Sequence, residues 1–185
     1  TSTVTTLAPT TTIRRAPVRI MALGDSITEG TAYRKPLQVR LAASLCRVDF
    51  VGSVHLPTDT VGLFDPDHEG HGGFRTDQLA DGARAWVAAA KPEIVLVHAG
   101  TNDFYQNQDV ASTVADTKRL VAEVKAGQPG VRIFVAQIIP GGGIEQKTAE
   151  LNVALGALAE DPAVTVVDQH SGVDATVALL DVLDQ

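Results

Sequence analysis

The chain has 185 residues, a length typical of one domain that buries roughly 70% of the surface of its unfolded form. Its net charge of −7 argues against a nucleic-acid partner, and no apolar run reaches the ~20 residues of a membrane span. A single cysteine, Cys46, excludes a disulfide within the chain, and we interpret it as a small buried hydrophobe.

Residues 1–16 form a threonine-rich segment whose first twelve residues carry no charge. Such a composition cannot pack a core, so we interpret this segment as a linker or tail and residues 17–185 as one domain. The same composition is compatible with the mature end of an exported protein, which favours a secreted, extracellular location.

From residue 18 onward, short apolar runs alternate with longer amphipathic segments. Continuous β-branched runs are typical of strands buried on both faces of a parallel sheet. The predicted strands are 18–23, 48–51, 94–99, 133–138 and 164–167. Apolar residues at helical spacing predict helices over 33–45, 76–90, 110–126 and 144–160.

This alternation predicts an α/β fold of three layers, with a five-stranded parallel sheet between helices. Ligands of such sheets bind beyond the carboxyl ends of the strands. The segments expected to form a site are therefore 24–31, 52–75, 100–108, 139–143 and 168–185. The long segment 52–75, rich in glycine and histidine, has the length and composition of a functional loop.

The stretch "ALGDSITEG", residues 22–30, places Ser26 just after the first strand and before an expected helix. A hydroxyl there is exposed beside free helical N–H groups, which stabilise developing negative charge and suit a nucleophilic serine. A turn serine that merely caps backbone groups is the alternative. Neither GxGxxG nor a lysine-bearing phosphate loop is present, which argues against nucleotide binding.

Two further segments place N–H donors at the same edge of the sheet. "HAGTND", residues 98–103, contains Asn102, whose amide is the donor type that holds an oxyanion. "EGHGGFRT" contains Gly73, whose backbone a ligand can approach closely. Each could instead be an ordinary turn residue. Together, Ser26, Gly73 and Asn102 predict an acyl-transfer site with an oxyanion hole.

The stretches "GDSIT", "GHGG" and "GTND", in this order and spacing, resemble three of the four sequence blocks of the SGNH, or GDSL, serine hydrolases. The resemblance extends from about residue 17 to about residue 181. It is greatest to carbohydrate esterases of family three, the acetylxylan-esterase-like branch. It implies a flavodoxin-like fold with strand order 2-1-3-4-5.

The resemblance also implies a function, namely cofactor-free hydrolysis of small acyl esters, in particular acetyl esters of carbohydrate. It assigns Ser26 as the nucleophile. The N–H groups of Ser26 and Gly73 and the side chain of Asn102 become the oxyanion hole. The expected partner is an acylated polysaccharide or a small ester, with no nucleic acid and no membrane.

Asp25, His71 and Asp103 complete the predicted substrate-binding region. The resemblance implies that Asp25 and Asp103 orient loops, whereas His71 and His68 flank Glu69 near the expected pocket, where a substrate contact is plausible. The same His-Glu-His group fits no familiar zinc spacing, so no metal is expected. Of the other histidines, His98 is expected to be a core residue with hydrogen-bond partners, and His55 a loop residue.

The fourth block of the family, an Asp-x-x-His that supplies the general base, has no counterpart in this sequence. A neutral imidazole suits that role, whereas the final "DVLDQ" has a carboxylate, Asp184, which is a far weaker base. Three explanations stay open. The chain is truncated or altered at its end; it is an inactive glycan-binding or interaction module; or His170 acts as the base, with Asp168 or Asp174 behind it.

The family's last helix, which covers the sheet beside the first helix, is also missing from the pattern. Bare apolar surface would remain on that face, and monomers rarely expose such a surface. Either residues 174–183 fold back over it in a monomer, or a second chain covers it in a dimer. We expect the first arrangement.

Overall fold

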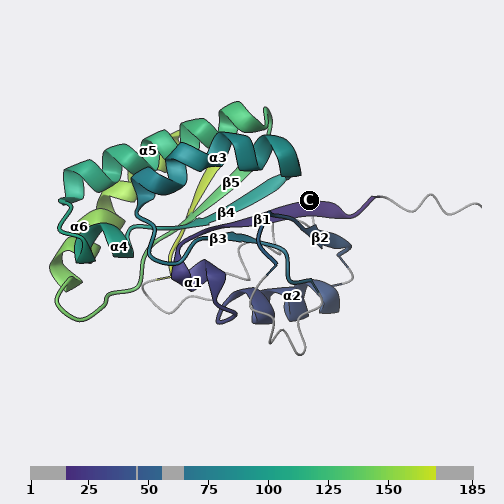
Figure 1. Cartoon of the computed structure of the whole chain (residues 1–185), viewed down its shortest axis with the longest axis horizontal. Helices are drawn as coiled ribbons and strands as arrows, with labels where there is room; N and C mark the ends of the chain where they lie inside the picture. The colour runs from purple at the N-terminus through teal and green to yellow at the C-terminus, as the bar shows by residue number, and fades with distance from the viewer. Residues whose placement is uncertain (1–15, 45, 56–64, 170–185) are drawn as a thin grey trace, which may run out of the picture.

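The computed structural model describes residues 16–44, 46–55 and 65–169, which form a parallel sheet between two layers of helices (Figure 1). Several predictions concern residues outside these ranges and stay predictions: the linker over 1–15, the base His170 and the covering segment 174–183. None of the described helices combines the length and apolar content of a bilayer-spanning segment.

The sheet has six strands, one more than predicted. They are β1 Val18–Gly24, β2 Val48–Phe50, β3 Glu69–Gly70, β4 Ile94–His98, β5 Arg132–Ala136 and β6 Val164–Val167. The order is β2-β1-β4-β5-β6, so the five predicted strands keep their predicted neighbours. The additional strand, β3, pairs with the last residues of β1. It lies on the same side of β1 as β2, which pairs with the first residues of β1. Two residues are too few to show a periodic pattern, which is why the sequence did not reveal β3.

Alternate residues of β1 enter two cores, one on each face of the sheet. Met21 and Leu23 belong to the larger core with residues of α3 and α5. Ile20 belongs to the smaller core with Leu37 and Leu41. All five of these residues are buried, which explains why the strand has a continuous apolar run rather than an alternating one.

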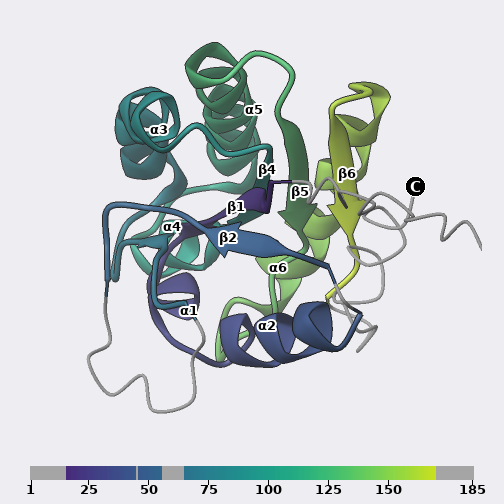
Figure 2. The ribbon, with the colours of Figure 1, turned by 90° about the vertical axis from the view of Figure 1, so that its right-hand side faces the viewer.

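The helices are α1 Ser26–Glu29, α2 Arg34–Ala43, α3 Thr76–Ala90, α4 Thr101–Tyr105, α5 Val110–Gly127 and α6 Glu145–Leu155. Helices α3 and α5 cover one face of the sheet, and α1 and α2 lie on the other (Figures 1 and 2). The predicted helix over 144–160 is α6 followed by a 3-10 helix, Gly156–Glu160. Helices α1 and α4, with four and five residues, are too short to show helical periodicity.

Two small helices, α1 and α4, follow β1 and β4 directly and lie at the carboxyl edge of the sheet (Figure 1). The adjacent strands β1 and β4 thus bring two of the predicted site segments to one place. Cys46 lies between α2 and β2 and is half-buried, less deeply than the buried hydrophobe that the sequence predicts.

Candidate active site

Ser26 is the first residue of α1 and is exposed, whereas Asp25 before it is buried. The Oδ1 atom of Asp25 accepts a hydrogen bond of 2.9 Å from the backbone N–H of Ile27 and so caps the helix. A Cβ at Gly24 would collide with the carbonyl of His98, so glycine there lets the chain turn directly off the strand. Ser26 is therefore an exposed residue at the beginning of a capped turn.

Arg34 ties the end of α1 to the backbone around it. Its fully buried guanidinium donates hydrogen bonds to the carbonyl oxygens of Thr28 (2.7 Å), Glu29 (3.0 Å), Gly30 (3.0 Å) and Pro66 (3.3 Å). Burial lowers the pKa of Arg34, but these charge-assisted bonds offset the desolvation of the guanidinium. Sequence alone does not indicate this role of Arg34, because arginine on a helix usually faces solvent.

Gly73 lies in a tight turn from His71 to Phe74. The N–H of Phe74 donates to the carbonyl of His71 (3.1 Å), and the N–H of His71 donates to the carbonyl of Gly24 (2.8 Å). Gly73, the third residue of this turn, has φ of +80°, whereas Gly72 does not have a positive φ, which is the φ pattern of a type II turn. A Cβ on Gly73 would meet no atom within 4 Å, so its conformation, not lack of space, requires glycine.

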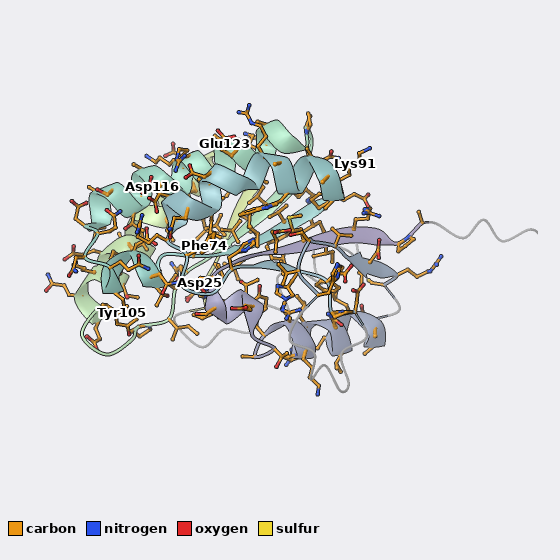
Figure 3. The ribbon with its side chains drawn as sticks, in the orientation of Figure 1. Asp25, Phe74, Lys91, Tyr105, Asp116 and Glu123 are labelled. Carbon is orange, nitrogen blue, oxygen red and sulfur yellow. The ribbon has the colours of Figure 1, made fainter. Side chains whose placement is uncertain are left out.

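Asn102 lies in the first turn of helix α4 and contacts the turn 71–74, which contains Gly73. Its Nδ2 donates a hydrogen bond of 2.9 Å to the carbonyl of Phe74, which leaves the second amide hydrogen available. Through these bonds, the turn 71–74 is attached to the end of β1 on one side and to α4 on the other. In Figure 3, Asp25 and Phe74 lie toward the same side of the molecule as Tyr105, the last residue of α4.

The model of the GDSL-like lipase/acylhydrolase family matches residues 22–181. The chain belongs to this family. It is an ester hydrolase, as its solved structural neighbours also indicate. No curated protein matches the sequence closely enough for comparison.

Three solved structures resemble this GDSL hydrolase over most of its length. A serine-to-alanine mutant of an acetyl esterase, with acetate ion, has a TM-score of 0.76 and 29% identity, covering 84% of this chain and 81% of that chain. A family 3 carbohydrate esterase from Talaromyces cellulolyticus has a TM-score of 0.75 and 31% identity, covering 82% and 78%. The family 3 carbohydrate esterase of Clostridium thermocellum has a TM-score of 0.73 and 30% identity, covering 83% and 78%.

Two buried carboxylates lie beneath the site of this GDSL hydrolase. Asp103 accepts hydrogen bonds of 3.0 Å from both the N–H and the hydroxyl of Thr76 and so joins α4 to α3. Burial raises the pKa of Asp103; burial also raises the pKa of Asp25, to about 6, despite the bond from Ile27. Because both carboxylates are buried, they are in a position to orient loops, the role that the resemblance predicts.

His71 is held from three sides. Its ring stacks on Phe74 and Trp86, with centroid distances of 5.0 and 4.4 Å, and its Nε2 lies 2.9 Å from Oε1 of Glu69. Burial alone would raise the pKa of Glu69, but hydrogen bonds from His71 and Ser53 outweigh it and hold the pKa below its usual value. These contacts fix the beginning of the turn 71–74, and a contact of His71 with substrate stays a prediction.

The remaining described histidines differ from expectation in two cases. His68 is fully buried and its Nδ1 accepts a 2.9 Å bond from the N–H of Gly70, so it does not lie where a substrate contact was expected. His98 is buried, but neither ring nitrogen has a hydrogen-bond partner among the described residues, so the expectation of a satisfied core histidine was wrong. His55 pairs with Asp67 at 2.6 Å.

No described histidine is therefore hydrogen-bonded to Ser26. The predicted base His170 lies three residues after β6, outside the described ranges. Strand β6 is three places from β1, about 14 Å at the usual ~4.8 Å spacing of strands. Within residues 16–44, 46–55 and 65–169, no three His, Cys, Asp or Glu side chains cluster as a metal site would require.

Asp25 and His98 are expected to change the free energy of unfolding in opposite directions with pH. The raised pKa of Asp25 stabilises the fold below pH 4, and this stabilisation is lost as pH rises through about 6. Burial lowers the pKa of His98 to about 4, so its stabilisation is present above pH 6.5 and lost as pH falls toward 4. Shifts of this size correspond to about 3 kcal/mol each.

Urea unfolding between pH 4 and 7 measures both effects. Relative to the wild type, Asp25→Asn is expected to gain unfolding free energy as pH rises, because it lacks the buried carboxylate. His98→Leu is expected to lose unfolding free energy relative to the wild type over the same range. Three parallel curves would contradict both assignments.

Proposed function

We propose that this protein is a serine esterase that removes acetyl groups from carbohydrate, with Ser26 as the nucleophile. The observation that carries the proposal is the connected edge of the sheet: the turn containing Gly73 is hydrogen-bonded both to the end of β1, next to Ser26, and to Asn102. A nucleophile next to several N–H donors is the arrangement that acyl transfer requires.

In the proposed reaction, Oγ of Ser26 attacks the ester carbonyl carbon. The N–H groups of Ser26 and Gly73 and the second amide hydrogen of Asn102 bind the resulting oxyanion. The serine proton passes to a base and then to the departing alcohol, which leaves an acyl group on Ser26. Water, deprotonated by the same base, hydrolyses this acyl-enzyme and releases the acid.

The base of this reaction comes from outside the described residues. The chain has five histidines, and the four that are described are either engaged with other groups or buried. His170 is the fifth. In the family, the base is a histidine of the fourth block, and "DVLDQ" contains no histidine at that place. His170 is therefore the candidate base within this sequence that a mutation can test.

An acetylated carbohydrate is the proposed substrate for two reasons. The neighbours at 29–31% identity are an acetyl esterase and two carbohydrate esterases of family 3. The segments after β4 and β5 also carry exposed apolar side chains, Tyr105 (53% exposed) and Ile139 (50% exposed). Tyr105 follows Asn102 by three residues and so lies on a similar side of α4, where its ring offers a flat surface to a sugar. A polymeric substrate of this kind agrees with the extracellular location predicted from residues 1–16.

The test measures acetate release by the intact chain from a chromogenic acetate ester and from acetylated xylan. We expect hydrolysis above buffer with both and faster hydrolysis of acetyl than of longer acyl esters. Binding of xylan with no release of acetate would contradict the proposal and favour an inactive glycan-binding protein of the same fold. Faster hydrolysis of long-chain esters would overturn the choice of acetyl.

A further inference from the structure

Gln106 follows α4 directly, four residues after Asn102 and thus on the same side of the helix. Its Nε2 donates a 2.8 Å hydrogen bond to the carbonyl oxygen of Gly73, and its Oε1 accepts a 2.9 Å bond from Nη1 of Arg75. Both the nitrogen and the oxygen of the Gln106 side-chain amide thus bind residues of the segment 73–75.

The conformation of the turn decides where the N–H of Gly73 points. That N–H belongs to the peptide between Gly72 and Gly73, the central peptide of the type II turn. Rotation of the central peptide converts a type II turn into a type I turn and moves its N–H to the opposite side. Two consecutive glycines offer little resistance to this rotation, because neither has a Cβ that favours one conformation. Contacts from outside the turn must hold it.

Helix α4 and its last cap residue supply two such contacts. Asn102 binds the carbonyl of Phe74, and Gln106 binds the carbonyl of Gly73. We propose that Gln106 is a positioning residue of the oxyanion hole, which holds the turn so that the N–H of Gly73 faces the reacting ester. This inference rests on the proposed function, since it acts through Gly73.

Arg75 fixes which end of the Gln106 amide faces the turn. Its Nε and Nη2 bind the carboxylate of Asp77 at 3.0 and 2.8 Å, so Nη1 is directed to Oε1 of Gln106. A reversed amide would place its NH₂ against the guanidinium and its oxygen against the carbonyl of Gly73, donor to donor and acceptor to acceptor. The Arg75 pairing therefore leaves Nε2 of Gln106 as the donor to Gly73.

The test compares Gln106→Glu with Gln106→Lys, using steady-state kinetics on a chromogenic acetate ester. The glutamate keeps an acceptor for Arg75 but sets a carboxylate oxygen against the carbonyl of Gly73. We expect its kcat to fall about 5- to 10-fold with KM unchanged, the size of one hydrogen bond expressed in the transition state. Lysine keeps a donor for the carbonyl of Gly73 but sets its ammonium against Nη1 of Arg75, so its kcat is expected to fall less than that of the glutamate variant. Gln108→Glu makes the same charge change two residues away and is expected to leave kcat unchanged.

A second readout does not depend on catalysis. In ¹⁵N-labelled protein without substrate, Gln106→Glu is expected to shift the amide resonance of Gly73 and to speed its hydrogen exchange, with a smaller change for Gln106→Lys. A Gly73 resonance that is the same in all variants would overturn the inference, as would a Gln106→Glu enzyme with unchanged kcat or a raised KM alone. A wild-type chain that hydrolyses no ester would overturn the proposed function, while the resonance of Gly73 would still decide whether Gln106 holds the turn.

Discussion

Ser26→Ala is expected to abolish acetate release, with a fall in kcat of about a million-fold, as for removal of the nucleophile in other serine hydrolases. Alanine cannot attack the ester, and the hydroxyls of Thr101 and Thr76, which begin α4 and α3 nearby, are buried and do not replace it. Ser26 is exposed, so its loss is expected to change the free energy of unfolding by less than about 0.5 kcal/mol. Progress curves at high enzyme concentration measure the residual rate.

Ser44→Ala is the matched control, because Ser44 caps the end of α2, away from the candidate site, and its hydroxyl donates to the carbonyl of Leu41. Full activity is expected for it. Activity retained by Ser26→Ala would rule out a serine mechanism at this position. The companion variant His170→Ala tests the base: a loss of several thousand-fold or more in kcat identifies His170 as that base, whereas an unchanged kcat shows that the base is another group.

Asn102→Ala is expected to lower kcat about 100- to 1000-fold, the usual cost of one oxyanion donor, and to change KM little. The amide has two hydrogens, one bound to the carbonyl of Phe74 and one available for the oxyanion. Alanine removes both, so the donor is lost and the turn around Gly73 loses one attachment. Measured kcat and KM on the chromogenic acetate ester separate the effect on rate from the effect on binding.

Asn102→Asp keeps the shape of the side chain but removes both donated hydrogens, so its kcat is expected to fall at least as far. Asn102 is half-buried, so both variants are expected to fold. Their kinetics therefore report on the lost donor rather than on unfolding. A rise in KM with kcat unchanged would show that Asn102 binds the ground state and does not stabilise the transition state.

The sequence predicted most of the fold because the central strands β1, β4 and β5 contain apolar runs buried on both faces of the sheet. Helix α3, Thr76–Ala90, begins and ends where its apolar spacing predicted. The elements that the sequence pattern did not predict are β3, α1 and α4, which have two, four and five residues. Tertiary contacts, such as the pairing of Glu69 with Leu23 in the sheet, form these short elements, and no local pattern encodes them.

The residue types of the candidate site were also predictable, because nucleophile, bare backbone and amide follow strands that end at one edge. The hydrogen bonds that connect these residues were not predictable. The bonds that Gln106 makes to Gly73 and Arg75 depend on the side-chain directions of a five-residue helix and a tight turn. The burial of Arg34 and the lack of hydrogen-bond partners for the His98 ring nitrogens among the described residues likewise depend on how neighbouring elements pack, which spacing along the sequence does not determine.

Four residues are too few for a helix to persist alone in water, since the first turn costs more conformational entropy than its single bond returns. Helix α1 therefore depends on bonds from its surroundings, among them those of Arg34, which binds its carbonyls and also binds Pro66, 32 residues farther along the chain. Ser26, the proposed nucleophile, is thus expected to reach its native position late in folding, when these distant segments come together. Recovery of ester hydrolysis during refolding should consequently coincide with the last structural phase, so that turnover becomes a direct reporter of the native state.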